Sequence, residues 1–359
     1  MINLKQYGYI EKAAPPKGLM PARIVEVQRD QYAAITDLGE VSAALKGSFL
    51  HKAKGRSDFP CVGDFVFLQH NPVGVSQIAE VLPRHSKFAR ADFSGHAAGY
   101  AKTIHEQVIA SNFDYVFVLS SLNADFNVNR IERYVIQARQ SGGLPVVILN
   151  KADLVEDFAV FVEQVAQAVP SVPIHAVSAH TGFGLEALDK YMQPGKTAVF
   201  LGMSGVGKSS LLNAFMGTEV AAVQGIRESD SRGRHTTTHR QLFMLPCGAL
   251  IIDTPGMREL GLLDAGDGIG AAFSDVEDLF TQCRFTTCGH DNEPGCAVTA
   301  ALADGKLSDE RWERYLQLAW ENEYVSKRRP NRKKMGESYA NFSFRCKRRR
   351  RWRDLSSSD

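Results

Sequence analysis

The chain has 359 residues, of which 44% are hydrophobic and 23% charged, and its formal net charge is +2 at pH 7. This length and composition exclude a disordered polymer and allow two or three domains with hydrophobic cores. No apolar stretch is long enough to cross a bilayer, and the N-terminal sequence MINLKQYGYIEKAAPPKG lacks the apolar core of a signal peptide. We therefore expect a cytoplasmic protein without membrane contact.

Residues 22–82 alternate short β-rich segments with turn signals such as DLG and NPVG. The segments are ARIVEV, YAAIT, EVSAAL, GDFVFLQ and SQIAEVL. Their spacing predicts a small all-β barrel, for which five strands favour an OB-fold, while an SH3-like barrel remains an alternative. Residues 82–95, LPRHSKFARADFSG, are polar and irregular, and we expect them to form a linker.

From about residue 104 apolar strands alternate with helical patterns, which predicts a mostly parallel sheet with helices on both faces. In such a sheet, ligands bind at the carboxyl ends of the strands. The predicted strands are YVFVLSSL (115–122), VVILN (146–150), IHAVSA (174–179), TAVFLG (197–202), QLFML (241–245) and ALIID (249–253), and the helices include VNRIERYVIQARQ and FVEQVAQAV.

The strand TAVFLG leads into GMSGVGKSS, which fits the phosphate-loop pattern G-x-x-x-x-G-K-[ST] and opens an apolar helix. Backbone N–H groups of such a loop wrap the β-phosphate, Lys208 reaches the β- and γ-oxygens, and the Ser209 hydroxyl can bind Mg²⁺. The predicted phosphate-binding residues are Gly202, Met203, Ser204, Gly205, Val206, Gly207, Lys208, Ser209 and Ser210.

The sequence DTPG directly after the strand ALIID supplies the acidic partner that a phosphate loop needs. Asp253 at the strand end can hold Mg²⁺ through water, and the Gly256 amide can sense the γ-phosphate. Upstream, RHTTT offers a threonine that can complete the magnesium shell when triphosphate is bound. We choose Thr237 over its neighbours Thr236 and Thr238 for this catalytic role.

The position after DTPG has consequences for the rate of hydrolysis. A Ras-like GTPase places a glutamine there to orient the attacking water, whereas this chain has Met257, whose apolar side chain cannot do so. Slow intrinsic hydrolysis is therefore expected. His235, beside the threonines, is the hypothesised catalytic substitute, and contact with RNA is its alternative role.

The strand VVILN ends in an NKxD sequence that predicts guanine recognition. Asp153 can accept hydrogen bonds from guanine N1–H and the exocyclic amine, and adenine offers no such donor pair. Lys151 can lie along the ring, Asn150 can tie this loop to the phosphate loop, and the Ala179 amide can donate to guanine O6. The predicted base-binding residues are Asn150, Lys151, Ala152, Asp153, Ser178 and Ala179.

All five GTPase motifs are thus present, but in the order base loop, SA loop, phosphate loop, threonine loop and DTPG. An ordinary GTPase has the phosphate loop first. A segment can move from one end of a domain to the other when the termini lie close together and the new break falls in a surface loop. The order therefore predicts a circularly permuted GTPase in which DTPG leads directly into the C-terminal region.

Residues 283–296 read CRFTTCGHDNEPGC, with the spacing C-x4-C-x-H-x5-C. Three thiolates and one imidazole form a closed tetrahedral set, as one structural zinc ion requires. Half of the six cysteines crowd into this segment, which fits metal binding in a reducing compartment better than a disulfide framework. The predicted zinc ligands are Cys283, Cys288, His290 and Cys296.

The C-terminal tail, residues 327–359, carries 13 Lys/Arg and three acidic residues, a net charge of +10, whereas the remaining chain carries −8. A tail this basic on an acidic body suits a polyanion, and Phe342, Phe344 and Trp352 within it could stack on bases. A solvated, disordered tail is the alternative interpretation.

These motifs together resemble the RsgA family of small ribosomal subunit biogenesis GTPases, the permuted YjeQ/YloQ type. The resemblance rests on GxSGVGKSSLLN, HTTT, DTPG and CxxxxCxHxxxxxC, and it extends over about residues 22–325. It implies an OB-fold, a circularly permuted GTPase domain and a zinc domain. It also implies a GTPase that binds the small ribosomal subunit, assists its late maturation and is stimulated by it to hydrolyse GTP to GDP and phosphate.

The expected architecture is therefore multi-domain. It comprises an N-terminal OB-fold-like barrel with linker (1–95), a permuted α/β P-loop GTPase domain (96–275), a helical zinc-binding domain (276–326) and a basic tail (327–359). GTP or GDP, Mg²⁺ and one zinc ion are the expected ligands, and the small ribosomal subunit with its rRNA is the expected partner of a monomeric protein.

Two other functions fit the same motifs. One is a nucleotide-gated RNA-binding factor that acts as a placeholder with little turnover. The other is a signalling GTPase that acts on protein partners and whose activity is indifferent to ribosomes.

Overall fold

The computed structural model describes residues 3–11, 14–28, 31–53, 55–92, 105–123, 125–219, 240–253, 266–291 and 293–326. These residues divide into two compact units, the first within 1–92 and 105–261 and the second within 262–359. None of the helices in these ranges combines the length and the apolar character that crossing a bilayer requires.

The first unit begins with a short turn η1 (Leu4–Tyr7) and ends with the strand β13. Its elements are β1 (Met20–Gln28), β2 (Gln31–Thr36), β3 (Gly39–Leu45), α1 (Gly47–Lys52), η2 (Arg56–Asp58), β4 (Phe65–Gln69), β5 (Ser76–Val81), β6 (Lys87–Asp92), β7 (His105–Ser111), β8 (Tyr115–Ser121), α2 (Val128–Gln140), β9 (Leu144–Asn150), η3 (Ala152–Leu154), α3 (Ala159–Ala168), β10 (Ile174–Ala176), η4 (Leu185–Tyr191), β11 (Thr197–Leu201), α4 (Lys208–Met216), β12 (Arg240–Met244) and β13 (Leu250–Asp253).

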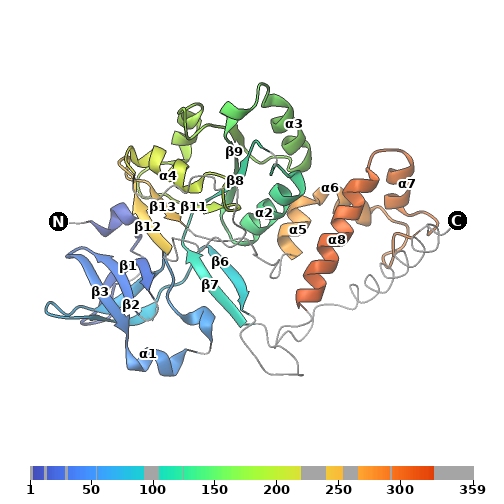
Figure 1. Ribbon diagram of the computed structural model, residues 1–359. Coiled ribbons are helices and arrows are strands. Elements are labelled where there is room, and N and C mark those ends of the chain that lie inside the picture. The colour runs from blue at the N-terminus through green and yellow to red at the C-terminus, as the bar shows by residue number, and fades with distance from the viewer. Residues whose placement is uncertain are drawn as a thin grey trace, which may run out of the picture. The chain divides into compact units, whose positions relative to one another are not determined.

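The first five strands form a closed barrel, as the sequence predicts, and Figure 1 labels its strands β1, β2 and β3. They lie in the order β1-β2-β3-β5-β4, and β4 pairs back to β1. The β3–β5 pairing is parallel and α1 lies between β3 and β4, an arrangement typical of an OB-fold and absent from an SH3-like barrel. Small and β-branched side chains such as Ala22, Ile24 and Val66 fill the interior.

The α/β region continues in the order β10-β9-β8-β11-β13-β12. Five of these strands, β10, β9, β8, β11 and β13, pair in parallel, and β12 runs antiparallel beside β13. The predicted mostly parallel sheet is therefore confirmed. The central strand β8 lies between β9 and β11, so the segments that follow these three strands emerge at one edge of the sheet.

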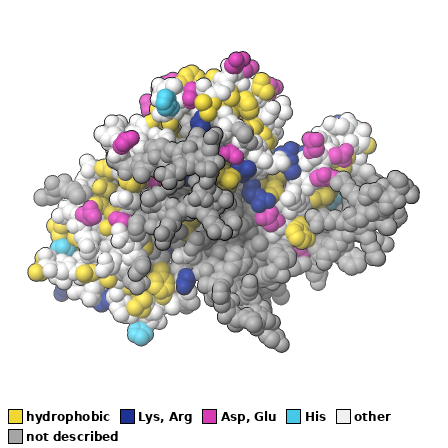
Figure 2. Space-filling view, in the orientation of Figure 1, with side chains coloured by type: hydrophobic (Ala, Val, Ile, Leu, Met, Phe, Trp, Pro, Cys, Tyr) yellow, Lys and Arg dark blue, Asp and Glu magenta, His cyan; other side chains and the backbone are white. Residues whose placement is uncertain are grey.

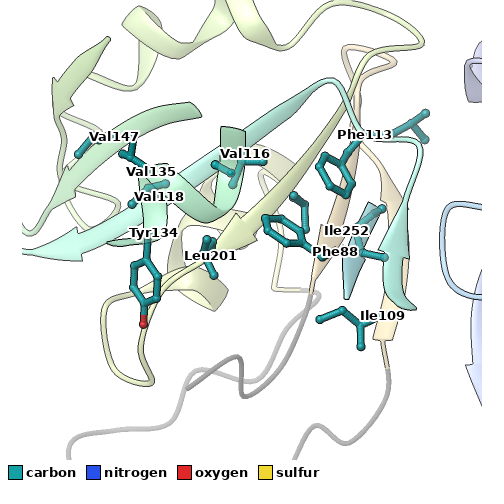
Figure 3. Close-up of a cluster of buried hydrophobic side chains, with 14 of the residues drawn as sticks. Phe88, Ile109, Phe113, Val116, Val118, Tyr134, Val135, Val147, Leu201 and Ile252 are labelled. Carbon is teal, nitrogen blue, oxygen red and sulfur yellow. The ribbon is translucent and has the colours of Figure 1, made fainter. Parts of the chain in front are cut away.

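Both faces of this sheet are buried. Neighbouring side chains along β8 point to opposite sides of the sheet, and each side is covered by helices. Val116 and Val118 pack with residues of α2 and α3 on one face, as Figure 3 shows for α2. Phe117 and Leu119 pack with α4 and η4 on the other. Such two-sided burial explains the nearly continuous apolar sequence of the strand.

The barrel and the α/β sheet are joined edge to edge. β1 pairs antiparallel with β12, with Glu26 opposite Gln241 and Val27 opposite Arg240. This pairing produces a single sheet of eleven strands. The barrel therefore shares backbone hydrogen bonds with the strand that follows the threonine loop in sequence.

The prediction that residues 82–95 form an irregular linker is wrong for the central part of this segment. Residues 87–92 form β6, which pairs antiparallel with β7 in a separate two-stranded sheet. Phe88 is 3% exposed and stacks on Phe113, with ring centroids 5.0 Å apart (Figure 3). The composition of KFARAD does not indicate a strand. Its strand character comes from pairing with residues 105–111, which are not adjacent in sequence.

The second unit contains four helices among the described residues: α5 (Gly266–Ala272), α6 (Ser274–Thr281), α7 (Ala297–Ala303) and α8 (Asp309–Ser326). Phe273, Val276, Val298 and Trp312 are buried between them. The predicted helical C-terminal region is confirmed, and the loop between α6 and α7 contains the cysteine cluster.

A buried arginine links three segments of the first unit. Arg23 of β1 is 1% exposed, and its guanidinium donates to the carbonyl oxygens of Tyr7, Gly63 (3.3 Å) and Asn112 (2.9 Å). It also lies over the Phe65 ring. Burial lowers the pKa of Arg23 to about 10, so the group remains charged at pH 7. The Arg23 guanidinium thus connects the N-terminal turn, the barrel and the start of the α/β region by hydrogen bonds.

We expect Arg23→Met to destabilise the first unit by about 3–5 kcal/mol, because the substitution leaves buried carbonyl groups without donors. Urea unfolding, monitored by far-UV circular dichroism, measures this loss of unfolding free energy. Lys52→Met removes a similar charge from an exposed position of α1 and should change the free energy of unfolding by less than about 0.5 kcal/mol. Equal stability of Arg23→Met and the parent chain would contradict the role of this contact.

Candidate nucleotide and metal sites

The phosphate loop lies between β11 and α4, where the sequence predicts it. Gly207 precedes α4 with φ 96°, a left-handed conformation that favours glycine. A Cβ atom on Gly202 would lie 2.6 Å from the Leu119 carbonyl oxygen, so this position also requires glycine. Lys208 Nζ donates to the carbonyl oxygens of Gly202 (2.8 Å) and Met203 (2.6 Å), which places the ammonium at the start of the loop.

Asn150 joins the predicted base loop to the phosphate loop. It is 2% exposed at the end of β9, and its Nδ2 donates to the Val206 carbonyl oxygen at 2.9 Å. A Cβ atom on Gly207 would lie 2.2 Å from the same Nδ2, so the two loops touch without room for a side chain. The predicted link between the two loops is therefore confirmed.

The remaining base-loop residues surround this link. Lys151 adopts φ 65° and its Nζ donates to the Gly205 carbonyl oxygen at 2.8 Å, so it lies across the phosphate loop. Ala152 is buried, and its amide donates to the Val177 carbonyl oxygen. Asp153 is exposed, which leaves its carboxylate accessible to a ligand.

The SA loop follows β10 and contacts the same asparagine. The Ala179 amide donates to Asn150 Oδ1 at 3.1 Å, rather than being free for guanine O6. The Ser178 hydroxyl accepts from the Thr181 amide, and this buried serine closes the turn. One amide side chain thus connects the loops that follow β9, β10 and β11.

Asp253 lies at the end of β13, beside the end of β11. The register pairs Val199 with Ile252, so Asp253 lies next to the strand that leads into the phosphate loop. The metal role of Asp253 stays a prediction. Other predicted residues lie outside the described ranges: His235, Thr236, Thr237, Thr238, Gly256 and the tail 327–359.

Arg130 was not predicted from the sequence, yet it lies at the phosphate loop. It is the third residue of α2, and its Nη1 contacts Met203 Sδ. No local pattern in VNRIERYVIQARQ distinguishes it from a surface arginine. Only the parallel pairing of β8 with β11 brings the start of α2 to this loop.

The four predicted metal ligands of the second unit come together. Their ligand atoms all lie within 4.8 Å of one another, and His290 Nδ1 is 3.5 Å from Cys283 Sγ and 3.6 Å from Cys296 Sγ. Amides of Ala297 and Thr299 donate to two of the sulfurs at 3.4 Å. Three sulfurs and one nitrogen, converging at this distance, fit a tetrahedral zinc ion.

The protonation states of this cluster differ between its members. Burial lowers the pKa of His290 against an opposing effect of Glu293, so the imidazole is neutral and its Nδ1 can bind metal. Burial raises the pKa of Cys288 to about 11, whereas hydrogen bonds from Thr299 outweigh burial and lower that of Cys296. A bound divalent cation would hold both as thiolates. His290 also stacks on Phe280, with ring centroids 4.3 Å apart, which fixes its orientation.

Comparisons with known proteins agree with this geometry. A family model described as RsgA GTPase matches residues 81–263. "Small ribosomal subunit biogenesis GTPase RsgA 2" of Listeria monocytogenes is 42% identical over 91% of this chain and 91% of that protein. A protein of Methanosarcina acetivorans with the name "Small ribosomal subunit biogenesis GTPase RsgA" is 44% identical over 75% of this chain and 71% of its own length.

Two solved structures share the fold. The crystal structure of YjeQ from Thermotoga maritima is similar with a TM-score of 0.61 and 25% identity, over 87% of this chain and 100% of that chain. The structure of YloQ, described as a circularly permuted GTPase, has a TM-score of 0.59 and 21% identity, over 88% of this chain and 98% of its own. Because the family model matches more than half of the residues and relatives align over almost the whole sequence, the chain belongs to the RsgA GTPase family.

Proposed function

We propose that this protein hydrolyses GTP to GDP and phosphate in the cytoplasm and assists maturation of the small ribosomal subunit. The observation that carries the GTP site is the pair of hydrogen bonds made by Asn150, which bring a guanine-reading loop and a phosphate loop into contact. The ribosomal partner is suggested by the names of relatives that align over about nine-tenths of the chain.

In this proposal each loop performs one part of nucleotide binding. Asp153 accepts the N1–H and amine protons of guanine, and Lys151 covers the ring with its alkyl chain. The Ala179 amide is proposed to donate to guanine O6 as well as to Asn150 Oδ1, so that the link between the loops is kept in the bound state. Backbone amides of residues 202–210 surround the phosphates, with Lys208 exchanging carbonyl oxygens for β- and γ-phosphate oxygens.

Magnesium would bind between the Ser209 hydroxyl and Asp253, with Thr237 added in the triphosphate state. The hard oxygen donors of these residues are those that Mg²⁺ prefers, and the bound ion would neutralise charge on the β- and γ-phosphates. We further propose His235 as the residue that orients the attacking water, since Met257 has no polar group for this task.

Zinc would be held by Cys283, Cys288, His290 and Cys296 in a structural role. All four protein positions of a tetrahedral ion are taken by the cluster, so no site for a reacting water remains. The ion would stabilise the loop between α6 and α7, a segment too short to have a large apolar core of its own.

Ribosomal RNA is the proposed contact of the barrel, the zinc-binding unit and the basic tail. OB-folds commonly bind nucleic acid. On the face that Figure 2 shows, Lys/Arg and Asp/Glu side chains of the described residues are interspersed, without one broad basic surface. The sequence of residues 327–359 carries a net charge of +10.

The test is GTP hydrolysis by the full-length protein alone and with purified small subunits, large subunits or free rRNA. We expect slow hydrolysis alone and at least about tenfold stimulation by small subunits only, as for GTPases that are completed by a partner. Stimulation by large subunits instead would contradict the partner. Activity that ignores every ribosomal component would favour a signalling GTPase.

We expect the purified protein to contain about one zinc ion per chain, and Cys288→Ser to lose it and to unfold the second unit. GDP affinity should stay within about twofold, because the nucleotide loops belong to the first unit. Elemental analysis, circular dichroism and fluorescent GDP binding give the three readouts.

The matched control is Cys247→Ser, which alters an exposed free cysteine outside the cluster and should retain the metal. Iron in place of zinc, or a Cys288→Ser protein with full metal content and helicity, would contradict the assignment.

A further inference from the structure

Arg130 is a cation at the phosphate loop whose side-chain contacts in the described part of the chain are a thioether sulfur and one distant backbone carbonyl oxygen. Its Nη1 contacts the Met203 thioether and lies 3.4 Å from the Asp125 carbonyl oxygen. A guanidinium has five N–H donors and pairs best with carboxylate or phosphate oxygens. Among the described residues no carboxylate pairs with it, so a phosphate bound at this loop would be a stronger acceptor than either of these contacts.

The fold fixes where this side chain begins. Arg130 is in the first turn of α2, where its own amide donates to the Asn127 side chain at 2.9 Å. The helix follows β8, and β8 pairs in parallel with β11, so the start of α2 and the phosphate loop lie at the same edge of the sheet. Tyr134 and Val135, labelled in Figure 3, and Ile131 pack α2 into the buried core beside the sheet.

Two cationic groups converge on Met203. Lys208 Nζ donates to its carbonyl oxygen at 2.6 Å, and the Arg130 guanidinium contacts its sulfur. Lysine at this point of a phosphate loop reaches the β- and γ-oxygens of the nucleotide. A second cation beside the same residue therefore lies near the phosphate end of the ligand, away from the base loop.

We propose that Arg130 is a catalytic residue that binds the γ-phosphate of GTP from α2 and stabilises the transition state of hydrolysis. This inference rests on the proposed GTP site. Water adds to the γ-phosphorus, and the bond from phosphorus to the β–γ bridging oxygen breaks with its electron pair remaining on GDP. One proton of the water stays on inorganic phosphate and the other passes to solvent. Arg130 neutralises charge on the γ-oxygens, as an arginine supplied within the same chain does in other GTPases.

Met257 has no polar group with which to orient water after DTPG, and Arg130 would act on a different part of the transition state, the charge on the γ-oxygens. In binding GTP, the guanidinium would exchange a thioether contact for a charge-assisted hydrogen bond, which is about twice as strong as a neutral one. GDP has no γ-phosphate and gains nothing from this exchange. The proposal therefore predicts a selective effect on the triphosphate.

The experiment compares the full-length chain with Arg130→Ala, Arg130→Lys and the control Arg139→Ala, which removes the same charge from the last turn of the same helix. Two quantities are measured for each variant. One is the affinity for GDP and for the non-hydrolysable analogue guanylyl imidodiphosphate, and the other is the rate of single-turnover GTP hydrolysis. For Arg130→Ala we expect about tenfold weaker analogue binding, GDP binding within about twofold, and hydrolysis slower by roughly a hundredfold or more.

Arg130→Lys should recover much of the analogue affinity but little of the rate, since lysine cannot bind bidentately. Arg139→Ala should behave like the parent chain. Equal weakening of GDP and analogue by Arg130→Ala would show that Arg130 only supports the loop, and unchanged rates would also overturn the proposal. Failure of the parent chain to bind either nucleotide would instead refute the GTP site itself.

Discussion

The nucleotide site depends on one buried amide side chain. Asn150 donates to Val206 of the phosphate loop and accepts from Ala179 of the SA loop, so that segments following three different strands are held in one place. A buried amide has a strong requirement for partners, because each unsatisfied group costs about 1–3 kcal/mol. The three loops are therefore specified together, and their order along the chain has no effect on the contact. Circular permutation preserves the site for this reason.

Circular permutation also changes which parts of the chain adjoin the nucleotide site. The strand β12, which follows the threonine loop, pairs with β1 of the barrel, and β13 ends at Asp253 before the chain continues toward the second unit. The strands beside the two segments that are expected to sense the γ-phosphate are thus joined to the barrel by pairing and followed in sequence by the second unit.

Much of this arrangement follows from local sequence patterns. The strand ends at VVILN and TAVFLG, the link through Asn150 and the cysteine cluster were all predictable, because each depends on residues close together in sequence or on a known loop. β6 was not predictable, since its strand character comes from pairing with β7 and from Phe88 packing on Phe113. Arg130 was missed for a related reason. Its place at the phosphate loop results from the β8–β11 pairing, which sequence periodicity does not encode.

The central claim, that a base loop preceding the phosphate loop reads guanine, is tested most directly by the nucleotide preference of Asp153→Asn. The account predicts weaker GTP binding and stronger binding of xanthosine triphosphate, because xanthine carries a carbonyl where guanine has its amine and the new side chain can donate to it. Asp157→Asn, an exposed change of equal charge in the loop before α3, should leave both affinities unchanged. Full retention of GTP affinity by Asp153→Asn, without any gain for the xanthine nucleotide, would contradict the account.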